Sequence, residues 1–356
     1  MILLNPGPVT LTERVRSALT AADLCHREVE FADLQDTIRT RLRAVYDLDE
    51  RWAAVVLSGS GTAAVEAMIS SLPGADARLL IIENGVYGER MTRMAHIHGI
   101  AHQTLRFEWG EHIDSDRLAA QLTDGDFTHV AVVHHETTTG RLNDLAAIGE
   151  VCAMRNVQML IDGVSSFGAE AIDFDRLPVA AVAATANKCL HGAPGAAFVL
   201  VRRVALSDAT PCSLYLDLAG YCEKQDARST PFTPAIPAFH ALAEALAEHE
   251  DEGGWQARRA NYRRLAGQVA DGFSALGIQA VLDADESSCV LRAYALPVGI
   301  DYDALHDHLK SQGFVIYAGQ GGLAASIFRI STMGAIDTVD IERLITAVSS
   351  IVHNRL

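Results

Sequence analysis

The sequence lacks several features that would assign it to a familiar class of protein. Its 356 residues contain no apolar run of the roughly 18 residues that a membrane-spanning helix needs. The opening stretch, MILLNPGPVT, has neither the basic segment nor the apolar segment of a signal peptide. None of the six cysteines forms a C-x-x-C pair, which argues against a zinc ribbon or a redox dithiol. We therefore expect a reduced, cytoplasmic enzyme without a membrane partner.

The chain also has fewer cationic than anionic residues. The chain has 29 lysines and arginines against 45 aspartates and glutamates, for a formal net charge of −16. Because nucleic-acid binding depends on clustered cations, we expect no nucleic-acid partner. We expect no metal centre either, because a metal needs two or three convergent ligands, which neither His134-His135 nor His96-x-His98 supplies.

The chain does have a repeating pattern of short apolar runs and helical segments. Its length and its 49% content of hydrophobic residues are too great for a single compact core and suggest two domains. The runs carry few polar residues, so we expect a mainly parallel sheet, covered by helices on both sides, up to about residue 230. The predicted strands are 53–57, 79–82, 129–133, 159–161, 179–184 and 196–201.

The pattern changes after residues 229–237, a segment with three prolines that we expect to be an extended connector. Beyond it the sequence predicts helices over 238–250 and from about 255, and a final helix with Asp337 as its N-cap. We expect a smaller α+β C-terminal domain of roughly 100 residues. The strands predicted there are 290–296, 314–317 and 327–331.

A glycine turn follows the first predicted strand, in the stretch VVLSGSGTAA at residues 55–64. It is not a P-loop, because no Gly-Lys-Ser/Thr follows the glycine. It does match the dinucleotide-binding pattern as Gly59-x-Gly61-x-x-Ala64. Glu83 also lies 22 positions after Gly61, where a ribose-binding acid belongs. A nicotinamide-dependent oxidoreductase is therefore one hypothesis.

The same turn suits a phosphate cup for pyridoxal 5′-phosphate (PLP). Ser60, Gly61 and Thr62 would offer backbone N–H groups and hydroxyls at a helix N-terminus, where the helix dipole favours a phosphate. The turn alone does not decide between a dinucleotide and PLP, so other residues must.

Two charged residues end apolar strands further along the chain. Asp162 ends the run MLID, where a carboxylate suits a cationic pyridine nitrogen, although aspartate also favours caps and turns. Lys188 ends another apolar run; a desolvated amine there suits a Schiff base with an aldehyde, and a surface lysine is the alternative. They are 26 positions apart, enough for one strand–crossover–strand step, so two strand ends would hold opposite ends of one ring.

Two further residues bear on the choice of cofactor. Arg329 lies in the apolar strand IFRIS, where a guanidinium needs either a ligand anion, such as a carboxylate or phosphonate, or an internal salt bridge. Tyr87, in GVYG, would stack on a flat cofactor or pack in the core. The PLP hypothesis accounts for the amine, the acid, the phosphate cup and the remote arginine. The dinucleotide hypothesis accounts for the cup alone, so we favour PLP. A serine hydrolase is not supported, because no G-x-S-x-G elbow is present.

These segments together resemble the class V, fold-type-I PLP-dependent aminotransferases, and HETTTG, SSFGA and ANKC resemble the aminoethylphosphonate branch of that family. The resemblance covers nearly the whole chain. It implies an α/β fold with a large, mainly parallel-sheet domain between helices and a smaller α+β C-terminal domain. The implied parts are an N-terminal segment that reaches the active site (1–20), a PLP-binding domain (21–237) and a small domain (238–356). The segments that carry the resemblance are LLNPGPVT, DLCHREVEF, SGSGTAAVEAM, NGVYGERM, THVAVVHHETTTG, DGVSSFGAEAID, ATANKCLHGAPG, FTP, IYAGQGG and IFRIS.

The resemblance also implies how the cofactor is held. Lys188 would form the Schiff base with PLP, and Asp162 would pair with the pyridinium nitrogen. The other cofactor-binding residues would be Ser60, Gly61 and Thr62 at the phosphate, Tyr87 near the ring face, Thr139 near the ring hydroxyl, and Ser165.

The activity implied is ping-pong transamination. 2-Aminoethylphosphonate would give its amino group to pyruvate, which yields phosphonoacetaldehyde and L-alanine. Arg329 would bind the anions of both substrates in turn, with Gly7 also at the substrate. Thr233 would reach the phosphate of the neighbouring subunit's cofactor in a homodimer.

Three segments depart from that family's pattern. Where the family often shows DAMSS, FTSPT and IYPGK, this chain has DGVSS at 162–166, FTPAI at 232–236 and IYAGQ at 316–320. The last change places Gln320 where a lysine would add a cation near the substrate's anion. An alanine– or serine–glyoxylate type of transaminase therefore stays open as the alternative.

Overall fold

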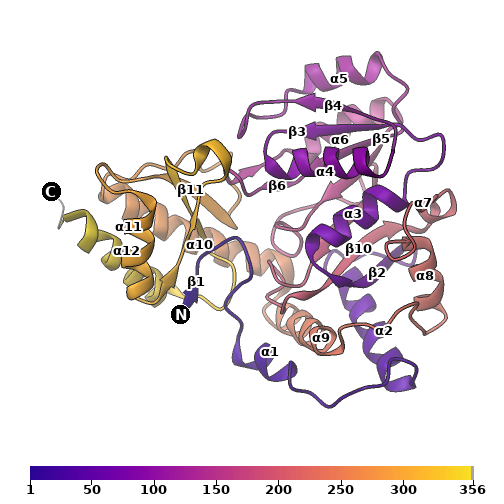
Figure 1. Cartoon of the computed structure of the whole chain (residues 1–356), viewed down its shortest axis with the longest axis horizontal. Helices are drawn as coiled ribbons and strands as arrows, with labels where there is room; N and C mark the ends of the chain where they lie inside the picture. The colour runs from indigo at the N-terminus through magenta and orange to yellow at the C-terminus, as the bar shows by residue number, and fades with distance from the viewer. Residues whose placement is uncertain (354–356) are drawn as a thin grey trace.

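The computed structural model describes residues 1–353, and residues 354–356, the end of the predicted small domain, lie outside the described residues. A large sheet with helices on both faces forms one part, and a smaller part contains the C-terminal helices together with the N-terminal strand (Figure 1). The predicted α/β fold with a large and a small part is confirmed.

The central sheet of the described chain has seven strands in the order β2-β10-β9-β8-β5-β3-β4. All six strands predicted for this region are present. Five neighbouring strands are parallel, and β10 alone runs antiparallel to both of its neighbours. The strands are β2 (Trp52–Gly59), β3 (Leu79–Glu83), β4 (His102–Arg106), β5 (His129–Val133), β8 (Gln158–Asp162), β9 (Val179–Thr185) and β10 (Gly195–Arg202).

Helices cover both faces of this sheet because alternate side chains of each strand point in opposite directions. Val56 lies in one apolar core with residues of α2, α5, α6 and α9. Val55 lies in a second core with residues of α3, α4 and α8. The helices of this part are α1 (Glu13–Ala18), α2 (Val29–Ala44), α3 (Gly61–Ser71), α4 (Val86–Ile97), α5 (Ser115–Thr123), α6 (Leu145–Met154), α7 (Arg203–Ser207), α8 (Leu218–Asp226) and α9 (Ile236–Asp251).

The smaller part is built on a three-stranded antiparallel sheet, β11-β14-β13. The N-terminal strand β1 crosses to this part and pairs in parallel with β12. Asp337 accepts a hydrogen bond from the Asp340 amide at the start of the last helix, as its predicted capping role requires. The elements are β1 (Ile2–Leu3), α10 (Gly254–Ala275), β11 (Leu291–Ala295), α11 (Tyr302–Ser311), β12 (Phe314–Val315), β13 (Tyr317–Ala318), the 3₁₀ turn η1 (Gly321–Leu323), β14 (Ile327–Ser331) and α12 (Thr338–His353).

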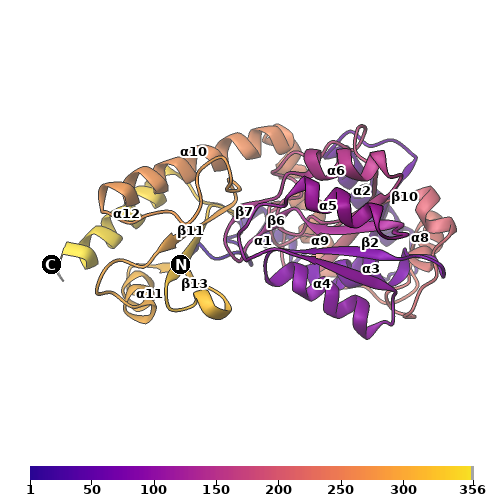
Figure 2. The same ribbon diagram turned by 90° about the horizontal axis from the view of Figure 1, so that it is seen from above.

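Helix α9 packs on the large part of the molecule, although the sequence predicted it to lie in the small domain. Phe239, Leu242 and Leu246 of α9 belong to the same apolar core as the α2 side chains. Helix α10, which follows α9, runs from the large part along the smaller one (Figure 2). The division of the chain at residues 20 and 237 stays a prediction, and this packing favours a second boundary nearer Gly253.

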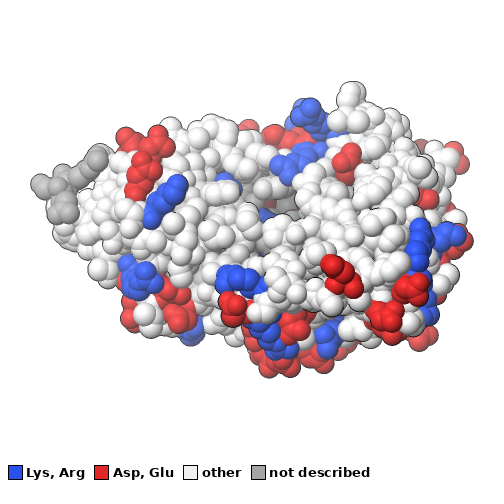
Figure 3. Space-filling model, turned by 60° about the horizontal axis from the view of Figure 1, so that its bottom comes forward, with Lys and Arg blue, Asp and Glu red and all other residues white. Residues whose placement is uncertain are grey.

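The surface carries charges of both signs. On the face drawn in Figure 3, acidic and basic side chains are interspersed and form no extended basic patch. Within residues 1–353, no helix combines the length and the apolar character that crossing a bilayer would require.

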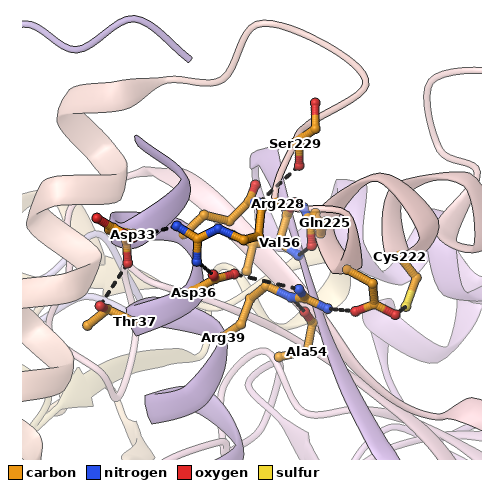
Figure 4. Close-up of polar contacts among 12 residues, drawn as sticks. Asp33, Asp36, Thr37, Arg39, Ala54, Val56, Cys222, Gln225, Arg228 and Ser229 are labelled. Carbon is orange, nitrogen blue, oxygen red and sulfur yellow. Dashed lines mark hydrogen bonds and ion pairs between the residues drawn. The ribbon is translucent and has the colours of Figure 1, made fainter. Parts of the chain in front are cut away.

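A polar cluster fixes the end of α8, just before the proline-rich connector (Figure 4). The buried Gln225 side chain bonds both the N–H and the C=O of Val56, at 3.1 and 2.6 Å. Arg228 forms ion pairs with Asp33 and Asp36 of α2. Because these contacts tie the connector's start to β2 and α2, the segment that carries Thr233 begins from a fixed point.

Candidate active site

Lys188 and Asp162 lie at one edge of the central sheet. Asp162 is the last residue of β8, and Lys188 lies three positions after the end of β9. These strands are parallel neighbours, with Asp162 paired to Ala183, so their carboxyl ends meet at the same edge. The two side chains influence each other's ionisation directly, which brings the predicted amine and acid together.

The environment of Lys188 favours the uncharged amine. Burial lowers its pKa to about 8, and the nearby guanidinium groups of Arg329 and Arg90 act in the same direction. Asp162 opposes this shift, and burial raises the pKa of its own carboxyl to about 6. Lys188 is also one of only three lysines in the chain. A desolvated amine that is partly neutral near physiological pH is suited to act as a nucleophile and as a base.

The N-terminal segment closes over Lys188. The ammonium group of Lys188 donates a hydrogen bond to the carbonyl of Pro6. A Cβ on the next residue, Gly7, would lie 2.7 Å from Cδ and 2.8 Å from Cε of Lys188. Gly7 also has a φ of +111°, in the region that favours glycine. Both the space and the backbone therefore require glycine at this position.

The predicted phosphate cup lies beside the turn that follows Asp162. Ser60 is the N-cap of α3 but makes no side-chain capping bond, and its carbonyl accepts from the amides of Ala63 and Ala64. The amides of Gly61 and Thr62 are therefore the donors of this first turn that have no partner within the described residues. A Cβ on Gly61 would lie 2.7 Å from Cγ1 of Val164, which shows how closely the two turns approach. The N-terminus of α3 and the turn after β8 thus lie directly against each other.

Arg90 adds a cation to this phosphate cup, although no role was predicted for it from the sequence. Its guanidinium donates to the Thr62 hydroxyl at 3.2 Å and stacks over the Tyr87 ring, 4.7 Å from the ring centroid. Arg90 and Tyr87 are one helical turn apart on α4, so the i, i+3 spacing within NGVYGERM was the available signal. A phosphate at the α3 N-terminus would meet both the helix dipole and this guanidinium.

His135 presents a buried hydrogen-bond acceptor near Lys188. Its Nδ1–H donates to the carbonyl of Ser165 at 2.9 Å, while its Nε2 is buried without a partner among the described residues. Burial lowers the pKa of the ring to about 4, so the imidazole is neutral and Nε2 carries a lone pair. Ser165, which the sequence predicted as a cofactor contact, is buried in the turn after Asp162.

Glu136 and the three threonines that follow it make different contacts. Glu136 accepts bonds from the Tyr87 amide and from both the amide and the hydroxyl of Thr138. Burial raises the pKa of this carboxyl to about 7. Thr139, predicted to approach the cofactor ring, lies against Gly110. The Thr137 carbonyl instead meets Arg329, and the hydroxyls of Thr137 and Thr139 are buried without a partner in residues 1–353.

Arg329 projects from β14 of the smaller part to the large part. Its Nε donates to the carbonyl of Ala318 at 2.8 Å, and its Nη1 donates to the carbonyl of Thr137 at 2.9 Å. No carboxylate of residues 1–353 lies within ion-pair distance, and Nη2 has no acceptor there. The internal salt bridge considered from the sequence is therefore absent from this part of the chain. A buried guanidinium with one unused donor edge is suited to bind an anion.

Comparisons with known proteins match this geometry. A model of the family described as "Aminotransferase class-V" matches residues 14–344. The chain belongs to the class-V aminotransferases. Among curated relatives, the 2-aminoethylphosphonate–pyruvate transaminase of Lactiplantibacillus plantarum is 35% identical over 98% of this chain and 96% of its own length. The enzyme of that name from Aeromonas hydrophila is 36% identical over 98% and 94%.

Solved structures of other aminotransferases have the same fold. An aspartate aminotransferase of subgroup IV from Thermus thermophilus superposes with a TM-score of 0.91 at 27% identity, covering 100% of both chains. An alanine–glyoxylate aminotransferase from Nostoc sp. gives a TM-score of 0.91 at 26% identity, covering 98% of this chain and 94% of its own. The predictions of family, fold and aminotransferase activity are confirmed.

PLP is the cofactor of this class-V aminotransferase, as predicted. The buried Nε2 of His135, the open first turn of α3 and the close approach at Gly61 all fit such a group. The nicotinamide hypothesis is set aside, because Glu83, its proposed ribose ligand, is ion-paired with Arg106 at 2.9 Å. Individual contacts of the predicted site residues with PLP stay predictions.

Replacing Gly7 with alanine should lower kcat for transamination by about a hundredfold, because the new Cβ displaces the Lys188 side chain. Gly99→Ala is the matched control: Gly99 also has a positive φ, of +68°, but nothing lies within 4 Å of its Cβ position. Steady-state kinetics and urea unfolding of both variants separate a catalytic effect from a loss of stability. Equal activity in the two variants would contradict the packing role of Gly7.

In the cofactor-free protein, acylation of Lys188 should accelerate through a midpoint at about pH 8, because burial lowers the pKa of this amine from 10.5. Asp162→Asn should move the midpoint further down, since it removes the carboxylate that favours the charged amine. Mass spectrometry of the labelled peptides measures each site, with exposed Lys224 and Lys310 as internal references for the reagent. A Lys188 midpoint above pH 10 would refute the assignment.

Proposed function

We propose that this aminotransferase moves the amino group of 2-aminoethylphosphonate to pyruvate, giving phosphonoacetaldehyde and L-alanine in two half-reactions. The observation that carries the proposal is the unused Nη2 edge of Arg329, which lies close enough to Lys188 to lower its pKa. An arginine in this position suits a small amine or keto acid with an anionic group at one end. When that anion binds Arg329, the reacting carbon at the other end would lie near Lys188. The names of the curated relatives supply the chemical identity.

Different side chains of this protein would bind the cofactor and transfer the proton. PLP supplies an electron sink when it is bound. Ser60, Gly61, Thr62 and Arg90 would hold its phosphate. The Asp162 carboxylate would stabilise a protonated ring nitrogen. Lys188 Nζ would bind the cofactor's aldehyde carbon and, once released by the incoming amine, would take the proton from the substrate carbon that bears the amino group.

Arg329 would fix the distance between the anion and that carbon. Its guanidinium is held at two edges by the carbonyls of Ala318 and Thr137, so it cannot turn to follow a misplaced substrate. Gly7 and Pro6 would cover Lys188 on the remaining side and exclude water. The phosphonate of one substrate and the carboxylate of the other would occupy this arginine in turn.

The working unit that we propose is a homodimer in the cytoplasm, in which Thr233 reaches the phosphate of the partner's cofactor. Thr233 is exposed, and the Ala235 amide two positions later bonds the Ser58 hydroxyl beside the cup at 2.8 Å. Leu214 and Tyr215, at 83% and 44% exposure, form an apolar patch with Phe232 next to this segment. Such a patch favours a protein interface. The scattered, unpaired cysteines suit a reducing compartment.

An alanine– or serine–glyoxylate activity is the second candidate. The observation that favours it is Gln320, which bonds Arg329 where a second cation would favour a phosphonate. The structural likeness to an alanine–glyoxylate aminotransferase also supports this candidate.

The purified holoenzyme should form L-alanine from 2-aminoethylphosphonate and pyruvate faster than it forms glycine from serine or alanine and glyoxylate. Both products are measured by chromatography under matched conditions. Lys188→Ala should abolish the reaction and the visible absorbance of the bound cofactor, because it removes the amine that would bind the cofactor's aldehyde and take the proton from the substrate carbon. Lys224→Ala and Lys310→Ala, both on the surface, should leave both properties intact. Faster formation of glycine would favour the second candidate.

Inactive Thr233→Asp and Lys188→Ala proteins should regain activity when they are mixed and allowed to exchange subunits. If Thr233 acts across the interface, each mixed dimer contains one site with neither substitution, about a quarter of all sites after random exchange. The aspartate is chosen because its charge repels a phosphate. Each variant exchanged with itself is the control. A mixture as inactive as its parents, with exchange shown by mass, would place Thr233 at its own subunit's site.

A further inference from the structure

Gln320 lies directly against the anion-binding arginine. Its Oε1 is 3.4 Å from Nη1 of Arg329 and 3.4 Å from the Thr138 hydroxyl. Because an arginine side chain offers only donors, the amide must turn its oxygen to Arg329 and its nitrogen away. Within residues 1–353, this amide nitrogen has no acceptor.

Two donors of this contacting pair therefore have no acceptor in residues 1–353, Nη2 of Arg329 and Nε2 of Gln320. An oxyanion head group offers two or three oxygens, enough to accept from both. One of the donors is charged and the other is neutral. A phosphonate, a sulfonate and a carboxylate would all find the same hydrogen bonds here, so hydrogen-bond count does not distinguish among them.

The surrounding groups add no further positive charge at this end of the site. Apart from burial, the strongest influences on the pKa of Arg329 come from the phenols of Tyr87, Tyr302 and Tyr317 and the carboxyl of Glu136. Glu136 lies behind the Thr138 hydroxyl, at 2.6 Å, and is neutral or negative. Lys188 and Arg90 are also near, but they belong to the ends of the site at which the cofactor would be held. Within one subunit, Arg329 is thus the cation that this end of the site offers to a head group.

Charge balance then decides which head group binds best. A single negative charge is matched by Arg329, whereas a second one would be desolvated without a partner, and an unpaired buried charge is costly. We propose that Arg329 and Gln320 form a one-cation site, in which Gln320 selects amines whose distal oxyanion carries a single negative charge. This inference rests on the proposed function for the role of Arg329, and it narrows the substrate to singly charged head groups: a carboxylate, a sulfonate or a singly protonated phosphonate.

The test is direct binding to the holoenzyme of anions that lack an amine. Ethanesulfonate is singly charged at any working pH. Ethylphosphonate has a second pKa above the value of about 6 found for phosphate esters, because carbon replaces the ester oxygen, so the titration is run at about pH 9.5, where the phosphonate is doubly charged. We expect the wild-type protein to bind ethanesulfonate at least as tightly as ethylphosphonate. Gln320→Lys should improve ethylphosphonate binding relative to ethanesulfonate by about tenfold or more, because it adds a charge-assisted hydrogen bond. Isothermal titration calorimetry measures both dissociation constants.

Control variants test whether the change in binding depends on where the new charge lies. Gln312→Lys places the same charge on an exposed site at the end of α11 and should leave the ratio unchanged. Arg329→Met should remove binding of both anions. Gln320→Glu should weaken ethylphosphonate more than ethanesulfonate, which keeps the test available if the lysine variant does not fold.

The proposal is overturned if wild-type protein prefers the doubly charged anion by tenfold, if Gln320→Lys leaves the ratio where it was, or if neither anion binds. These outcomes are separate from a failure of the proposed function. A protein that shows the expected change in ratio, but makes no L-alanine from 2-aminoethylphosphonate, keeps the one-cation site and loses the proposed donor.

Discussion

The desolvation of Lys188 is the constraint on which the rest of the site depends. An amine that must act as nucleophile and base has to be uncharged for part of the time, and burial beside two guanidinium groups achieves this. The same burial acts on Asp162 in the opposite direction and raises its pKa to about 6. The site therefore contains an amine and an acid that both lie closer to neutrality than in water. A cationic ring nitrogen beside Asp162 would favour the ionised carboxylate. The same cation would not favour the charged form of Lys188.

That desolvation requires parts of the chain that are distant in sequence. The N-terminal segment covers Lys188 through Pro6 and Gly7, and its strand β1 is fixed by pairing with β12 of the smaller part. The smaller part also supplies Arg329, whose Nη1 is held by the Thr137 carbonyl of the large part. The site is consequently complete only when the two parts are packed together. A change in their packing would move the arginine, the N-terminal cover and the lysine environment at the same time.

The sequence predicted most of the central sheet, because its buried strands are nearly continuous apolar runs. It missed β4, whose residues HQTLR are mostly polar, since an edge strand need not bury both faces. It predicted Asp162 and Lys188 because charged residues at the ends of apolar strands are rare. Arg90 was missed because a surface helix contains many arginines, and only the fold shows which of them faces the cup. The contact of Thr137 with Arg329 depends on packing between the two parts, which no local pattern records.

The hydrogen bonds of buried arginines distinguish structural from functional roles in this chain. Arg258 is as buried as Arg329, but two of its nitrogens bond the Glu252 carboxylate and a third bonds the Cys189 carbonyl, so its charge is already neutralised. Arg329 is held by carbonyl and amide oxygens, which fix its orientation and leave its charge uncompensated. An uncompensated buried charge is unfavourable in the free protein, and an anionic substrate relieves it. Binding and orientation of the substrate then have the same physical origin, because the donor that remains open, Nη2, belongs to the guanidinium that the two carbonyls hold in place.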